Sequence, residues 1–174
     1  MKKFGLVTLV LALLVAAPAF AATAFVNVGV SANIAANCTI TSAPVAFGAY
    51  DPIVTNASTP LDGSGSVTIT CTKGATTFVS LGLGIQPSVS QRRMTDGVPN
   101  YMNYELYQPP NTTPGAACSY TSPTVWGTAG ANLFTPAAAP SKAARTYNIC
   151  GQVAAGQDLP AGTFTDTVVA TVNF

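Results

Sequence analysis

The sequence contains no histidine, and only 7% of its 174 residues are charged. Without histidine, the chain lacks the general base of the Ser-His-Asp and Cys-His systems that activate a nucleophile. It also lacks a common ligand of metal sites, and its cysteines form no Cys-x-x-Cys pair. We therefore expect a non-enzymatic protein with no cofactor and no metal.

The charged residues are also too scattered to form a functional cluster. Most of the acids lie in turn-rich stretches, where a solvated loop acid is the simplest interpretation, and Arg92-Arg93 is interpreted as a surface basic pair. Nothing in this balance attracts nucleic acid or an anionic membrane. The six acids are Asp51, Asp62, Asp96, Glu105, Asp158 and Asp166.

The N-terminus has the layout of a secretory signal peptide. A short basic start with Lys2 and Lys3 precedes the apolar stretch 4–15, and small residues follow it. We place cleavage after Ala21, so that residues 1–21 are the signal peptide; Pro18 and the small residues argue against a membrane anchor. No later run reaches the roughly 18 apolar residues needed to span a bilayer. We expect an exported protein without a membrane span after cleavage.

The remaining chain of about 153 residues is long enough for one domain with a real core. Loss of Lys2 and Lys3 leaves five basic residues against six acidic ones, a formal charge of −1. An even number of cysteines in an exported chain predicts two disulfide bonds, with three possible pairings. The four cysteines are Cys38, Cys71, Cys118 and Cys150.

A period of two, typical of half-buried strands, dominates the mature chain. Turn clusters rich in Gly, Pro, Asn and Asp separate the runs, among them "NASTPLDGSG" and "RRMTDGVPN". Many short strands separated by such turn clusters predict an all-β fold, a β-sandwich. The clearest strand candidates are 66–71, 78–85, 101–107 and 164–174.

The two ends of the mature chain are both one-faced apolar strands. From 26 to 34 every second residue is apolar, and the run 164–174 shows a similar alternation. An exposed strand edge can accept an added strand, which gains main-chain hydrogen bonds and inserts alternate side chains into pockets. The periodicity fits equally well a complete sandwich, in which both runs pair within one chain.

Several segments resemble the spore coat protein U domain family, which includes subunits of archaic chaperone–usher pili. The matching pieces are "ANCTI", "VAFGAYDP", "GSVTITC", "YMNYELY", "WG" and "CGQVAAGQDLPAGTFTDTVVATVNF". Their order and spacing extend the resemblance over residues 22–174.

The resemblance implies an incomplete immunoglobulin-like sandwich that lacks its final strand. In that family a periplasmic chaperone fills the gap, and an outer-membrane usher replaces the chaperone with the N-terminal strand of the next subunit. Carried onto this chain, residues 22–33 form the donor strand and residues 34–174 the domain. The inserted side chains are Val26, Val28, Val30 and Ala32; the last strand presents Val168, Ala170, Val172 and Phe174 to chaperone and donor.

The family also implies a chaperone cleft that binds the free carboxylate of Phe174. It implies a disulfide between the two early strands, here Cys38 with Cys71, which leaves Cys118 with Cys150.

Three functions remain open at this point. The first is a structural subunit of a surface pilus or fibre that serves attachment and biofilm formation, with chaperone, usher and neighbouring subunits as partners. The second is a spore coat protein assembled by the same strand exchange. The third is a monomeric secreted carbohydrate-binding sandwich that uses exposed aromatic residues. The candidate aromatics are Tyr101, Tyr107, Tyr120 and Trp126.

Overall fold

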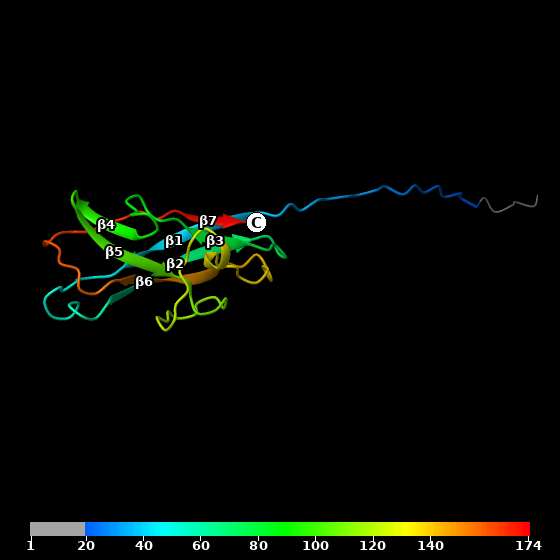
Figure 1. The fold of residues 1–174 in the computed structure, drawn as a ribbon. Helices are drawn as coiled ribbons and strands as arrows, with labels where there is room; N and C mark the ends of the chain where they lie inside the picture. The colour runs from blue at the N-terminus through cyan, green and yellow to red at the C-terminus, as the bar shows by residue number, and fades with distance from the viewer. Residues whose placement is uncertain (1–19) are drawn as a thin grey trace, which may run out of the picture. The chain divides into compact units, whose positions relative to one another are not determined.

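The computed structural model describes residues 20–174, and they divide into two units. Residues 20–33 belong to an N-terminal segment without regular secondary structure, and residues 34–174 form a β-domain (Figure 1). The predicted signal peptide lies almost entirely outside the described residues. The domain contains seven strands and one short 3-10 helix. They are β1 Cys38–Ala46, β2 Leu61–Cys71, β3 Phe78–Leu81, β4 Arg92–Gly97, β5 Asn100–Tyr107, η1 Gly130–Asn132, β6 Arg145–Val153 and β7 Ala170–Asn173.

The strands form two sheets of unequal size. The larger sheet has the order β1-β2-β6-β5-β4, the smaller one pairs β3 with β7, and every paired neighbour is antiparallel. The described residues contain no regular α-helix. The all-β, immunoglobulin-like prediction is confirmed.

The core lies between the two sheets and is centred on Trp126. Its indole Nε1 donates a hydrogen bond to the carbonyl oxygen of Val79 at 2.9 Å, and its ring packs on Phe134 with centroids 4.9 Å apart. Phe134 in turn packs edge-on against Tyr147, also at 4.9 Å. All four residues are fully or almost fully buried. A single indole thus connects the small sheet to the large one, with its one polar atom satisfied.

Period-two patterning located the buried faces of the central strands correctly. In β2 the side chains of Val67 and Ile69 are inaccessible, and in β5 Met102, Tyr104 and Leu106 are buried. The strand predicted at 78–85 is shorter in the structure, because β3 ends at Leu81.

The turn prediction for "RRMTDGVPN" is wrong. Residues 92–97 form β4, which pairs with β5. The short turn between the two strands contains the cis peptide bond Val98-Pro99. Likewise "LDGSG", placed in a turn cluster, is the first half of β2. The inward face of β4 includes Arg92, an arginine that a hydropathy pattern counts as exposed.

Candidate strand-binding groove

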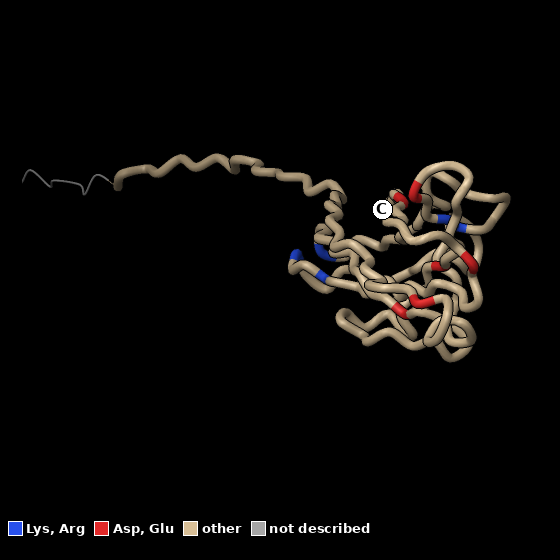
Figure 2. Tube along the Cα trace, turned by 90° about the vertical axis from the view of Figure 1, so that its left-hand side faces the viewer, with Lys and Arg blue, Asp and Glu red and all other residues tan. Residues whose placement is uncertain are grey.

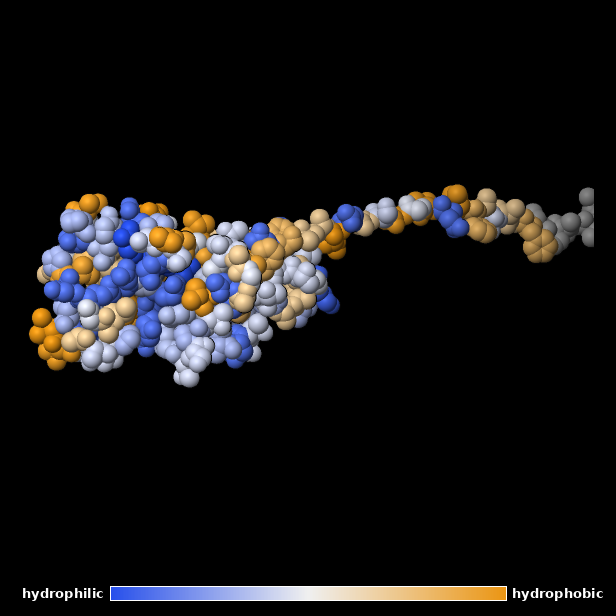
Figure 3. Space-filling model, viewed as in Figure 1, coloured by the Kyte–Doolittle hydropathy of each residue, from blue (hydrophilic) through white to orange (hydrophobic). Residues whose placement is uncertain are grey.

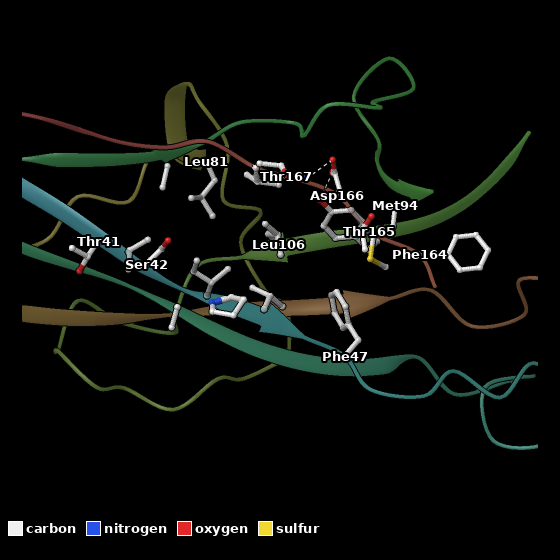
Figure 4. A pocket seen from close by; sticks show the side chains of 18 of the residues that line it. Thr41, Ser42, Phe47, Leu81, Met94, Leu106, Phe164, Thr165, Asp166 and Thr167 are labelled. Atoms are coloured by element: carbon white, nitrogen blue, oxygen red, sulfur yellow. Dashed lines mark hydrogen bonds between the residues drawn. The ribbon is translucent and has the colours of Figure 1, made fainter. Parts of the chain in front are cut away.

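A groove of about 510 Å³ with an apolar floor runs along the domain between β1 and the segment that leads into β7 (Figure 4). One wall is residues 40–47 and the other is residues 164–170. Buried side chains from both sheets form the floor: Val67, Leu81, Met94, Tyr104, Leu106 and Ile149.

Several apolar side chains of the two walls are only half-buried, unlike those of the floor. Ile40 and Val45 on one wall, and Phe164 and Val168 on the other, pack against the core and still keep solvent-accessible surface. Half-covered apolar side chains on facing walls are what an additional strand between the walls would bury.

Both strands that flank the groove have a free edge. Within residues 20–174, β1 pairs only with β2, and β7 pairs only with β3. A free edge presents unpaired backbone N–H and C=O groups that readily accept another strand. The groove therefore offers backbone hydrogen bonds as well as apolar contacts.

Among the residues that the structure describes, Asp166 is the one charged side chain that lines the groove. Its Oδ2 accepts a hydrogen bond from the Tyr104 hydroxyl at 2.6 Å, and its Oδ1 accepts one from the backbone N–H of Ile85 at 2.9 Å. Burial, reinforced by the hydrogen bond to Asp166, raises the pKa of Tyr104 far above its ordinary value, so its hydroxyl stays a donor. No local pattern in the sequence indicates this pairing, because Tyr104 and Asp166 are 62 residues apart.

The N-terminal segment carries the alternating apolar residues on an exposed chain. The side chains of Val26, Val28 and Val30 are 84%, 80% and 92% exposed, and Ala32 is also exposed. Figure 3 shows hydrophobic residues interspersed with polar ones along this segment, and Figure 2 shows no charged residue on it. Among residues 20–33 the structure assigns no strand.

The terminal residues have the alternation expected of a strand with one inward face. Val168, Ala170 and Val172 are half-buried against the core, whereas Val169 is 67% exposed. Phe174, the fourth residue predicted for this face, is 58% exposed. The regular strand is shorter than predicted, since β7 begins only at Ala170.

Two disulfide bonds cross-link parts of the domain. Cys38–Cys71 joins directly opposed residues of β1 and β2, so it secures the start of one groove wall. Cys118–Cys150 ties the long loop after β5 to β6.

Two interpretations of individual side chains were wrong. Arg92 is not on the surface: it is fully buried and forms an ion pair with Glu105 of β5. Trp126, one of the aromatics considered for sugar binding, is fully buried in the core. The hydroxyl of Tyr120 donates to the carbonyl oxygen of Gly63, so that residue too has an intramolecular role.

Comparison with known families identifies the domain. The family model described as the Spore Coat Protein U domain matches residues 23–171. The chain belongs to this family. It is 35% identical over 181 residues to Protein U of Myxococcus xanthus, covering 97% of this chain and 94% of that protein. The predicted family resemblance is confirmed.

A solved structure supports the fold. The chain is similar, with a TM-score of 0.52 and 21% identity, to a chain of the CsuC–CsuE chaperone–tip adhesion subunit pre-assembly complex from archaic chaperone–usher Csu pili of Acinetobacter baumannii. The match covers 81% of this chain and 40% of that one, so this chain spans less than half the length of its structural neighbour.

No group of three or more His, Cys, Asp or Glu side chains in residues 20–174 is placed to hold a metal ion. No helix in the same range is long and apolar enough to cross a membrane.

Proposed function

We propose that this protein is a non-enzymatic structural subunit of a cell-surface pilus or fibre, assembled by a chaperone–usher system through donor-strand complementation. The observation that carries the proposal is the apolar groove between two free strand edges, in a domain preceded by an exposed, one-faced apolar segment. The segment 22–33 of one copy is the donor, and the groove of the next copy is the acceptor.

Burial of the exposed valine side chains supports this exchange. Full burial of one valine side chain is worth roughly 1.5–3 kcal/mol. Val26, Val28 and Val30 are almost fully exposed on the free segment, so each gains most of that amount on insertion. Backbone hydrogen bonds to the two edges add to this, and the cost of ordering the segment is subtracted.

The expected partners are a periplasmic chaperone and an outer-membrane usher. A periplasmic chaperone covers the groove before assembly, and an outer-membrane usher delivers the chain to the previous subunit. The protein is exported through the periplasm to the surface, where the fibre serves attachment and biofilm formation. Membership of the family and the chaperone–subunit complex named in the structural neighbour support this assignment.

The description of the family favours a second candidate, a spore coat component built by the same strand exchange. The two candidates share the groove and the donor and differ in the final assembly. Antibody labelling of intact cells and spores separates them, because a pilus subunit labels filaments on growing cells and a coat protein labels the spore surface.

Strand exchange is tested by gel mobility of the purified chain 22–174, loaded unboiled and boiled. We expect an unboiled ladder of multiples that collapses to one band on boiling. Val28→Asp abolishes the ladder, because a charge cannot enter the apolar groove unpaired. Asn27→Asp is the matched control: it adds the same charge on the opposite face of the segment and keeps the ladder.

A single monomer band under both conditions, together with loss of folding in Val28→Asp, would show that the segment completes its own domain. Circular dichroism of each variant separates loss of assembly from loss of fold.

A further inference from the structure

This inference rests on the proposed function and concerns the end of the groove near Asp166. Thr165 and Thr95 exchange two backbone hydrogen bonds of 2.9 and 3.0 Å, which attach residue 165 to β4 in the large sheet. Four residues later the carbonyl of Val169 accepts from the N–H of Gly82 at 2.9 Å, beside the small sheet. The terminal segment thus crosses from one sheet to the other between residues 165 and 169.

Asp166 lies at the start of this crossing and binds three elements at once. Its carboxylate accepts from the Tyr104 hydroxyl on β5, from the N–H of Ile85 after β3, and from the N–H of its neighbour Thr167 at 2.7 Å. Figure 4 shows Asp166 beside Thr165 and Thr167, at the same end of the groove as Met94. One carboxylate therefore connects the wall of the groove to its floor and to the loop that follows β3.

The residue opposite the carboxylate is a glycine for a steric reason. At Gly84 an added Cβ atom would lie 1.9 Å from Oδ2 of Asp166, and the backbone there has φ +86°. Any side chain at this position would displace the carboxylate and strain the turn. The loop after β3 is thus shaped to receive Asp166.

An empty apolar groove between two free edges tends to close, because its half-covered walls gain by contact with each other. Charge-assisted hydrogen bonds oppose this movement at one point of the wall. We propose that Asp166 is a positioning residue that holds the terminal segment across the two sheets. The groove is thereby open, and the inward face of the terminal segment correctly aligned along it, before a donor strand enters. Tyr104 and Gly84 act through Asp166.

The experiment uses the whole chain 22–174 carrying Val28→Asp, whose own segment cannot serve as a donor. The probe is a fluorescent synthetic peptide with the native sequence of residues 22–34, and anisotropy gives its Kd and association rate. In this background Asp166→Ala weakens binding by roughly tenfold or more and slows association. Asp166→Asn retains most of the binding, since its carboxamide oxygen still accepts from Ile85 and Thr167.

Two further readouts distinguish positioning from general destabilisation. Amide hydrogen exchange at Ile85 and Thr167 accelerates in Asp166→Ala, while protection of the β2–β6 ladder is unchanged. Tyr104→Phe weakens binding in the parent but has no further effect when Asp166 is already alanine. Asp158→Ala, which removes an exposed acid outside the groove, leaves binding unchanged.

Equal Kd and association rate for the parent and for Asp166→Ala would overturn the inference and leave the proposed function intact. If Asp166→Ala fails to fold, Tyr104→Phe provides the test, because an unchanged Kd in that variant would also overturn the inference. Failure of every protein, the parent included, to bind the peptide would overturn the proposed function, and the inference with it.

Discussion

The guanidinium of Arg92 is fully buried and forms an ion pair with the carboxylate of Glu105. Its other donors reach the backbone carbonyl oxygens of Gly82 at 2.9 Å, Leu81 at 3.1 Å and Trp126 at 2.6 Å. One side chain thus connects the end of β3 to β4, β5 and the loop that carries the core tryptophan. The ion pair and these three hydrogen bonds together compensate the burial of the guanidinium charge.

Arg92→Ala is therefore expected to lower the free energy of unfolding by about 3–5 kcal/mol, because it removes the ion-pair partner of Glu105 and the side-chain donor to three carbonyl oxygens. Urea unfolding, followed by the fluorescence of Trp126, measures the change. The adjacent Arg93→Ala is the control: Arg93 stacks on the Tyr101 ring, with its guanidinium carbon 4.1 Å from the ring centroid, and its loss costs about 1 kcal/mol or less. Equal losses for the two variants would contradict the assignment.

The two disulfides are predicted to contribute similarly to the stability of the domain but to differ in their effect on donor binding. They close loops of 33 and 32 residues, so the chain-entropy model assigns each about 3.7 kcal/mol. Only Cys38–Cys71 lies on β1, the strand that forms one wall of the groove.

Replacing Cys38 and Cys71 together by alanine should lower both the unfolding free energy and the affinity for the 22–34 peptide. Replacing Cys118 and Cys150 together should lower the unfolding free energy and leave peptide affinity nearly unchanged. Matched chemical denaturation and anisotropy titrations check both statements. Equal losses of affinity would show that β1 needs no covalent support to form the groove.

Period-two patterning predicted the fold class and the central strands because their inward residues are plainly apolar, as with Val67 and Ile69. The strand β4 escaped detection because one of its inward residues is Arg92, whose burial depends on partners 10 to 34 residues away in sequence. No local pattern shows such long-range compensation.

The groove, too, was predictable from the sequence only in part. The inward positions of Val168, Ala170 and Val172 were predictable from their alternation, whereas the opposite wall was not, since the register of β1 shifts between Ala43 and Ala46. The role assigned to Asp166 depends on Tyr104 and Ile85, which the sequence places 62 and 81 residues away. Only the folded chain brings these groups together.

Tyr104 should make the domain sensitive to alkali. Burial, and then the hydrogen bond to Asp166, raise its pKa in the folded state above the unfolded value of about 10. This contribution to stability is fully present below about pH 10 and is lost as the pH rises beyond it, because only the unfolded chain then releases the phenolic proton. We expect urea midpoints to fall between about pH 10 and pH 12, and to fall less steeply in Tyr104→Phe.

A residual slope should remain in Tyr104→Phe, since burial also raises the pKa values of Tyr107, Tyr120 and Tyr147. Identical alkaline slopes for the parent and Tyr104→Phe would show that the Tyr104 hydroxyl ionises as readily in the folded chain as in the unfolded one.

The neighbouring residues Val168 and Val169 provide the sharpest test of which face of the terminal segment binds a donor. Val168 lines the groove and is half-buried, whereas Val169 points away and is 67% exposed. Val168→Asp should reduce affinity for the 22–34 peptide by about a hundredfold or more, because a bound donor would bury an unpaired charge against the apolar wall. Val169→Asp adds the same charge one residue along the chain and should leave affinity within about twofold of the parent, since solvent still hydrates it. The reverse order would place the donor on the outer face of the terminal segment, and the groove between β1 and β7 would then lose its proposed role.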